Sequence, residues 1–242
     1  MLIHFKLPIE FNIFTVTKQV IMQRYLLELF GTFALVFCGP GAIIMNDVSG
    51  GLVTHVGIAI TFGLIVMAMI YAIGEQSGAH INPAVTIAFW ASGRFNKKEV
   101  IPYIIAQITG GLIASCTLYL LFPEHITQGA TLPLNSISQA FILEVILSFL
   151  LMFVIIKVSR GSKETGTMAG IAIGGVVGLE AMFAGPITGA SMNPARSIAP
   201  ALFSGNTNCL WIYILAPIIG MLLASIFCKI TDENPIEISS QI

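Results

Sequence analysis

Charged side chains are scarce in this sequence: Asp, Glu, Lys and Arg together make up only 10% of its 242 residues, and the net charge is −1. Without a basic tract or a positive balance, the chain lacks the electrostatic features of a nucleic-acid-binding protein. Hydrophobic residues make up 56% of the chain, and the mean hydropathy is +0.90. This composition excludes an ordinary soluble globule and is typical of a protein that crosses a membrane several times.

Cysteine is also scarce, with four residues that lie in or at the edge of hydrophobic segments: Cys38, Cys116, Cys209 and Cys228. Their spacing shows no pairs of the kind that disulfide frameworks or metal sites use. We therefore expect free, buried thiols and neither a bound metal ion nor another cofactor.

Six hydrophobic segments are long enough to cross a bilayer as helices. They are Tyr25–Met45, Leu52–Ile73, Val100–Leu121, Ile137–Val158, Met168–Ala184 and Leu210–Cys228. Two further apolar segments, Asn82–Ser92 and Asn193–Phe203, are too short to cross. Short helices at membrane depth are tolerated only where protein buries them or where they line a water-filled cavity. The sequence therefore predicts an all-α membrane protein with six transmembrane helices and two half-helices.

The basic residues are distributed unevenly between the loops. All but one of the 11 Lys and Arg residues fall on one side of the predicted membrane: Lys6, Lys18, Arg24, Arg94, Lys97, Lys98, Lys157, Arg160, Lys163 and Lys229. The loops on the other side, Asn46–Gly51 and Pro123–Ser136, contain none. The positive-inside rule then predicts a multi-pass membrane protein with both termini in the cytoplasm. We expect it in the plasma membrane. The first residues make a poor signal peptide because charges interrupt their short apolar patch, and translation could begin at Met1 or at Met22.

The triplet Asn-Pro-Ala occurs twice, at Asn82–Ala84 and at Asn193–Ala195, each time shortly after a Gly-Ala pair. Proline is favoured at the first position of a helix and asparagine is a good cap, so each triplet predicts a helix N-terminus. The similarity between the two halves extends beyond the triplets. It pairs Gly78–Ala88 with Gly189–Ala199, and Tyr103–Ser115 with Tyr213–Ser225.

The two halves therefore indicate an internal duplication within a membrane domain of residues 25–229. Repeat one covers about 25–122 and repeat two about 137–229, with tails at 1–24 and 230–242. Each repeat has an odd number of spans, so the second repeat must be inverted in the membrane. Inverted repeats place their shared site near the midplane, which here is where the two half-helices meet. The positive ends of two helix dipoles at one point suit a polar solute held midway across the bilayer.

Asn82 and Asn193 are the first candidate site residues. In the simplest interpretation, each amide caps only its own helix. We expect more: backbone bonds hold each amide so that its NH₂ group points into the lumen, and a passing water or hydroxyl offers its oxygen to both. The two helix dipoles repel cations at the same place.

Arg196 is the only cation outside the cytoplasmic loops, and it directly follows the second triplet. A buried structural ion pair is one explanation for it. We favour a fixed charge with a fork of donors at a constriction near the outer mouth, where the donors replace lost hydration.

Four further polar residues lie within or beside the spans. Glu28 and Glu144 occupy similar places in the first and fourth spans, and this symmetry favours a structural role over a proton relay. We expect both to accept N–H bonds from the irregular loops before the half-helices. Glu180 has no counterpart, and could pair with loop backbone or lie near Arg196. His80 either lines an inner vestibule or packs as a hydrogen-bonded histidine.

At these motifs the chain resembles the aquaporin and aquaglyceroporin family, the major intrinsic proteins, from Tyr25 to about Cys228. The segments SGAHINPAVT (Ser77–Thr86) and GASMNPARS (Gly189–Ser197) carry the resemblance and are highly specific. It implies a non-enzymatic channel with one pore per subunit, assembled as a homotetramer. It also implies a selectivity constriction of four residues: Phe62, Ala181, Ala190 and Arg196.

The chain departs from strict water channels at Ala181. Those proteins share a histidine at this position, which narrows the pore. Alanine leaves Arg196 facing an aromatic ring and two methyl groups, which suits a solute with hydroxyls on one side and carbon or a metalloid on the other. The glycerol-facilitator pattern is also incomplete, since Ser197 stands where an Asp is usual and Ala201 where a basic residue is usual. The nodulin-like intrinsic proteins of plants and their microbial relatives are resembled at five positions together, Phe122, Ser197, Ala201, Tyr213 and Ile214, and in the segment FAGPITGASMNPARS (Phe183–Ser197). Those channels pass water, glycerol and neutral metalloid hydroxides.

We therefore expect a passive channel for water and small uncharged solutes such as polyols and metalloid hydroxides. One alternative is a strictly water-selective channel. A second, from another class, is an ion-coupled secondary transporter, because inverted repeats and broken helices also build those proteins. Glu180 is the one unexplained acid within the spans that such a transporter could use.

Overall fold

The structure, a computed structural model, describes residues 13–159 and 167–232. The expected tails, 1–24 and 230–242, lie partly outside these ranges. Lys6, Arg160, Lys163 and a start at Met1 lie wholly outside them.

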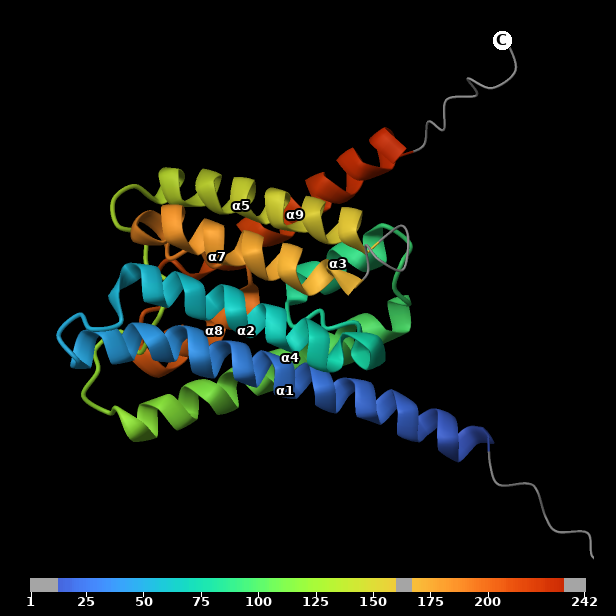
Figure 1. Cartoon of the computed structure of the whole chain (residues 1–242), viewed down its shortest axis with the longest axis horizontal. Coiled ribbons are helices and arrows are strands. Elements are labelled where there is room, and N and C mark those ends of the chain that lie inside the picture. Colours follow the sequence, from blue (N-terminus) through green and yellow to red (C-terminus); the bar gives the residue numbers. More distant parts are fainter. Residues whose placement is uncertain (1–12, 160–166, 233–242) are drawn as a thin grey trace, which may run out of the picture.

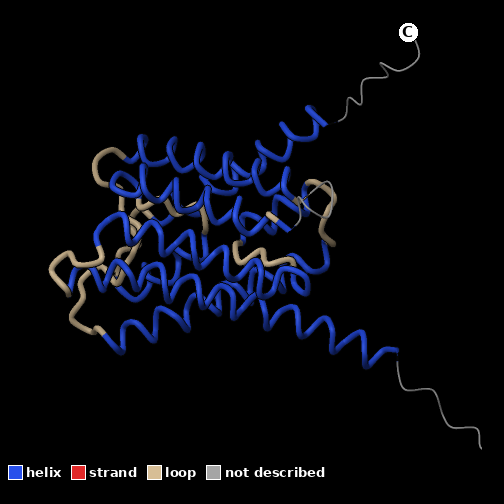
Figure 2. The backbone as a smooth tube through the Cα atoms, viewed as in Figure 1, coloured by secondary structure: helices blue, strands red, loops and turns tan. Residues whose placement is uncertain are grey.

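The described residues form α-helices joined by loops, without a strand (Figure 2). The helices are α1 (Ile13–Val48), α2 (Thr54–Ser77), α3 (Pro83–Ala91), α4 (Lys97–Leu121), α5 (Ile137–Val158), α7 (Ala169–Thr188), α8 (Pro194–Ser204) and α9 (Leu210–Asp232). Six of these, all but α3 and α8, are long and apolar enough to cross a membrane. The predicted all-α fold with six spans and two short helices is confirmed.

The first helix differs from its prediction. It begins at Ile13, well before the expected start of the first span at Tyr25. No proline or glycine lies between Ile13 and Phe30. The sequence therefore has no helix-breaking residue at Tyr25, where the apolar span begins. The helix therefore continues into the segment that the sequence assigned to a tail.

The two short helices begin where the triplets predicted. Asn82 and Asn193 are the N-cap residues, in extended conformations with φ of −158° and −148°, and a proline follows each of them. At a rise of about 1.5 Å per residue, helices of 9 and 11 residues span only about half of a bilayer core.

Corresponding helices of the two repeats make corresponding contacts. α1 packs against α2 and α4, and α5 packs against α7 and α9. Each short helix packs against a long helix of the other repeat, α3 against α9 and α8 against α4. Both ends of the described chain leave the bundle at the same end, at the right of Figure 1.

The two repeats come close to each other between α2 and α7, at Gly63 and Gly174. A Cβ atom on Gly174 would lie 2.6 Å from the carbonyl oxygen of Gly63 and 2.7 Å from the Cβ of Met67. Real Cβ atoms do not come so close, so only glycine allows this separation of the helix backbones.

Candidate functional site

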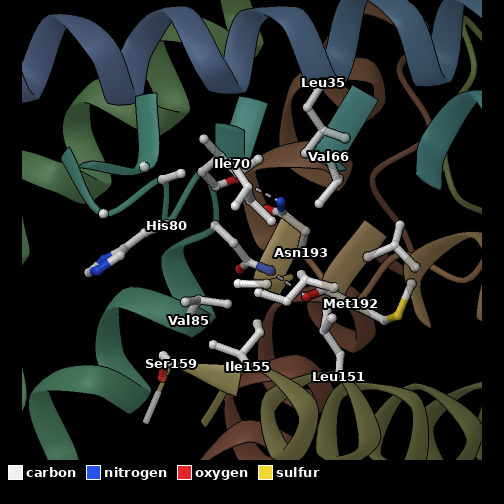
Figure 3. A pocket seen from close by; sticks show the side chains of 18 of the residues that line it. Leu35, Val66, Ile70, His80, Val85, Leu151, Ile155, Ser159, Met192 and Asn193 are labelled. Carbon is white, nitrogen blue, oxygen red and sulfur yellow. Dashed lines mark hydrogen bonds between the residues drawn. The ribbon is translucent and has the colours of Figure 1, made fainter. Parts of the chain in front are cut away.

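The N-termini of α3 and α8 meet in the middle of the bundle, where each capping asparagine bonds in two directions. The Oδ1 of Asn82 accepts from the N–H of Ala84 at 2.9 Å, and the Oδ1 of Asn193 accepts from the N–H of Ala195 at 3.0 Å. The amide Nδ2 of Asn82 donates to the carbonyl of Met192 at 2.8 Å, and that of Asn193 donates to the carbonyl of Ile81 at 2.9 Å. Each capping side chain is therefore also hydrogen-bonded to the loop of the other repeat. Figure 3 shows Asn193 and Met192 at this place.

The loops before the two short helices have the same unusual backbone. In the first loop φ is +46° at Ala79 and +41° at Ile81, and in the second it is +40° at Ala190 and +52° at Met192. Left-handed conformations are rare for residues other than glycine, above all for a β-branched residue. Each costs about 1–3 kcal/mol and persists only where the surroundings fix it.

Two buried carboxylates fix these loops. The oxygens of Glu28 on α1 accept from the N–H groups of His80 at 2.9 Å and Ile81 at 2.7 Å. The oxygens of Glu144 on α5 accept from the N–H groups of Ser191 and Met192, both at 2.9 Å. Both acids are fully buried. Glu28 and Glu144 therefore each satisfy two backbone N–H groups of one loop.

A cavity of about 670 Å³ passes the tips of the short helices. Seven of the residues singled out in the sequence line its wall together: Phe62, His80, Asn82, Ala181, Ala190, Asn193 and Arg196. The proline and alanine of each triplet are not among the lining residues. Figure 3 shows Val66 and Ile70 on one side of Asn193, and Leu151 and Ile155 on the other. The path along the asparagines thus has apolar walls.

Among the described residues, Arg196 is the largest fully buried side chain, and it has few partners. Its Nη1 donates to the carbonyl of Gly129 at 3.1 Å, and its guanidinium carbon lies 5.0 Å from the centre of the Phe62 ring. Its Nε has no hydrogen-bond partner, and within the described ranges no carboxylate lies within ion-pair distance of it. The structural ion pair that the sequence left open is therefore absent from this part of the chain.

The loop between α4 and α5 holds Arg196, and the sequence analysis did not foresee it. Besides the Gly129 carbonyl, this loop supplies the Oγ1 of Thr131, which donates to the Oγ of Ser197 at 2.8 Å. Ser197 also shares a hydrogen bond with the Oγ of Ser191. The available signal was Ser197 itself, which the sequence marked only as a departure from the glycerol-facilitator pattern.

His80 combines the two roles that the sequence left open. Its ring packs against Phe89, Phe95 and Tyr103 and its Nδ1 lies 3.1 Å from the Oγ1 of Thr86. It also lines the cavity, although only 8% of its surface is exposed.

Glu180 remains without a role. It is buried, and neither carboxylate oxygen has a hydrogen-bond partner among the described residues. It is not among the residues that line the cavity. Within residues 13–159 and 167–232, no three His, Cys, Asp or Glu side chains are grouped to hold a metal ion.

The apolar cavity wall is the other feature that the sequence analysis missed. It consists of stripes at a spacing of four residues: Phe62, Val66 and Ile70 on α2, Ala169, Ile173, Val177 and Ala181 on α7, and Leu151 and Ile155 on α5. Residues four apart share one helix face. Counting in fours from Phe62 and Ala181 would have found the stripes on α2 and α7.

The comparisons with known proteins agree with this architecture. The sequence profile described as Major intrinsic protein matches residues 15–228. Aquaporin NIP1-1 of Zea mays is 46% identical over 200 residues, which are 82% of this chain and 71% of that protein. The probable aquaporin NIP-type of Nicotiana alata is 48% identical over 211 residues, 86% of this chain and 77% of that protein.

Among solved structures, the X-ray structure of the aquaglyceroporin from Plasmodium falciparum has the same fold. The two superimpose with a TM-score of 0.79, covering 86% of this chain and 96% of that one, at 24% sequence identity.

Proposed function

Because the chain belongs to the major intrinsic protein family, a family of membrane channels and not of enzymes, we propose that it passively conducts water and small uncharged solutes. The solutes include glycerol-like polyols and neutral metalloid hydroxides such as boric or arsenous acid. Protons and ions are excluded.

The observation that carries this proposal is the pair of asparagine amides on the cavity wall. An amide NH₂ group has two hydrogens, and the opposite loop uses one hydrogen of Asn82 and one of Asn193. The remaining hydrogens serve an oxygen that passes between them. Such an oxygen accepts at this point, so its own hydrogens point away and no donor chain for protons continues through it. The positive ends of α3 and α8 add a barrier to cations.

The proposed selectivity filter consists of Phe62, Ala181, Ala190 and Arg196, which line one cavity. The guanidinium has five N–H donors, and the one bond to Gly129 leaves others for solute hydroxyls. The Phe62 ring and the two methyl groups offer carbon to the other side of the solute. A filter with methyl groups at both small positions supports the wider solute range.

The assembly and orientation belong to the same proposal. The channel domain is 25–229, it assembles as a homotetramer in the plasma membrane, and both termini are cytoplasmic. The exit of both described ends at one end of the bundle supports this orientation (Figure 1). So does the sequence, in which all Lys and Arg residues except Arg196 fall on one side of the predicted membrane.

Stopped-flow light scattering on proteoliposomes tests the proposal, with water, glycerol and boric acid measured side by side against protein-free vesicles. We expect flux of all three that does not saturate and does not respond to a proton gradient. Water flux without glycerol or boric acid flux would identify a strict water channel. Saturable, gradient-driven flux would identify a coupled transporter instead.

A further inference from the structure

Gly39 on α1 lies directly behind the aromatic ring of the proposed filter. Gly39 is buried, and a Cβ atom placed on it would overlap three ring carbons of Phe62, namely Cε1, Cζ and Cδ1. The ring therefore occupies the space that any other residue at position 39 would fill. Gly39 itself does not line the cavity, whereas Phe62 does.

The same ring also contacts the cation of the filter. The guanidinium carbon of Arg196 lies 5.0 Å from the ring centre, within the range of a cation–π interaction. The ring is thus packed between the backbone of α1 and the charged group that faces the solute. Its position, and with it the free width beside Arg196, depends on how closely α1 approaches.

We propose that Gly39 is a specificity-determining residue of this channel, and that it acts by setting the position of the Phe62 ring. The proposal rests on the proposed function, because it assigns selectivity to the group that contains Phe62 and Arg196. It adds a position outside the four that line the filter.

The structure favours movement of the ring over movement of the helix. Next along α1, Pro40 is packed so tightly against Gly129 that a Cβ on that glycine would lie 2.7 Å from the Cβ of Pro40. Gly129 is also the acceptor for Arg196. Since Pro40 keeps α1 in place, an added methyl group at position 39 displaces Phe62 toward Arg196 and the cavity. The helical backbone at Gly39 itself accepts alanine, which is the better helix former.

The test compares Gly39→Ala with Gly41→Ala in proteoliposomes. Gly41 is the matched control on the same helix, since a Cβ there meets only the Cδ2 of Leu118, at 3.4 Å. We expect G39A to reduce glycerol flux about tenfold and water flux far less, as overpacking of a close-packed group narrows the larger solute's path. G41A keeps both fluxes. An unchanged ratio of glycerol to water flux in G39A overturns the proposal.

A double-mutant cycle shows whether the effect passes through the ring. In the Phe62→Val background no ring is left to displace, so F62V and G39A/F62V should have the same flux ratio. If G39A lowers the ratio equally in both backgrounds, the assignment to Phe62 is wrong. Should G39A alone fail to assemble, the pair F62L and G39A/F62L replaces it: leucine relieves only part of the overlap, so the double variant can fold while the methyl group still displaces the leucine side chain toward the cavity. The ratio must then fall on addition of the methyl group, and an unchanged ratio overturns the proposal.

A structure of the folded variant separates this proposal from the proposed function. If the unmodified protein conducts no glycerol, the proposed solute range fails, while the position of Phe62 in an electron cryomicroscopy structure of G39A still decides the role of Gly39. A ring displaced toward Arg196 supports the inference. A ring in its original place, with α1 shifted instead, contradicts it.

Discussion

At the scale of single residues, the cavity wall combines one buried cation with apolar neighbours. Arg196 is only 2% exposed, bonds to a single carbonyl at Gly129, and lies over the Phe62 ring. Ala181 and Ala190 also line the cavity, and each side chain is a single methyl group. In the proposed filter, the polar chemistry is therefore concentrated in one guanidinium, and two positions that could hold larger side chains set the width.

Replacement of Arg196 by valine should admit cations while neutral solutes still pass. The fixed positive charge is part of the electrostatic barrier, and only the helix dipoles remain without it. A pH-sensitive dye trapped in proteoliposomes measures the proton leak. Lys98→Val is the matched control, because it removes a positive charge from an exposed residue outside the cavity. If R196V vesicles are as impermeable to protons and potassium as K98V vesicles, the helix dipoles alone form the cation barrier and the role assigned to Arg196 is wrong.

Replacement of Ala181 by histidine should convert the wide filter into a narrow one. The imidazole fills cross-section and adds a polar group opposite Phe62. We expect glycerol flux to fall about tenfold, the equivalent of about 1.4 kcal/mol, with a much smaller loss of water flux. Stopped-flow measurements of both solutes on one preparation check it. Equal loss of both fluxes would indicate misfolding, and no change would mean that Ala181 does not limit passage.

At the scale of elements, the sequence predicted the short helices to within a residue or two, because Asn and Pro define a helix start chemically. It also led to Glu28 and Glu144 through their symmetry. It could not predict that the asparagines bond across the repeats. Their acceptors are the backbone carbonyls of Met192 and Ile81, and every residue in a chain offers such a group. For the same reason the Gly129 carbonyl beside Arg196 was not foreseen.

Conversion of Glu28 to glutamine should destabilise the fold. A glutamine has one oxygen and places an NH₂ group against a backbone N–H that the carboxylate had satisfied. Each buried donor left without a partner costs about 1–3 kcal/mol. Thermal unfolding in detergent should show a lower transition temperature for E28Q than for Glu124→Gln, an exposed acid. Equal transition temperatures would show that the loop does not depend on this carboxylate.

The adjacent glycines 174 and 175 on α7 form a natural control pair. A methyl group on Gly174 meets the backbone of Gly63, whereas one on Gly175 meets nothing within 4 Å. Alanine is favoured over glycine within a helix by about 1 kcal/mol. We expect Gly174→Ala to lower the unfolding temperature and Gly175→Ala to keep or raise it. If G174A is as stable as G175A, the close approach of α2 and α7 contributes little to stability.

At the scale of the whole molecule, two repeats enclose one cavity, and neither repeat forms it alone. α2 belongs to the first repeat and α5 and α7 to the second, yet all three supply its apolar stripes. Each short helix is packed against a long helix of the other repeat. The lining of the cavity therefore contains side chains from both halves of the sequence.

The distribution of thiols over the molecule predicts weak inhibition by mercurials. None of the four cysteines is among the residues that line the cavity. Many water channels share a cysteine at the position of Ala190, and this chain lacks it. Water flux should therefore fall little after brief exposure to mercuric chloride. Strong inhibition that disappears in Cys38→Ser or Cys209→Ser would show that the course of the pore has been misassigned.

The bonds between Asn82 and Met192 and between Asn193 and Ile81 have a consequence for biosynthesis. Their partners are 110 and 112 residues apart, so a ribosome that adds about 5–20 residues per second needs about 5–20 s to supply the second partner after the first. During that interval, the amide of the first asparagine has no acceptor from the second repeat. The first three spans must therefore wait in the membrane in an unfinished state, and the tip of α3 reaches its final place only when the nascent chain has delivered its own second half.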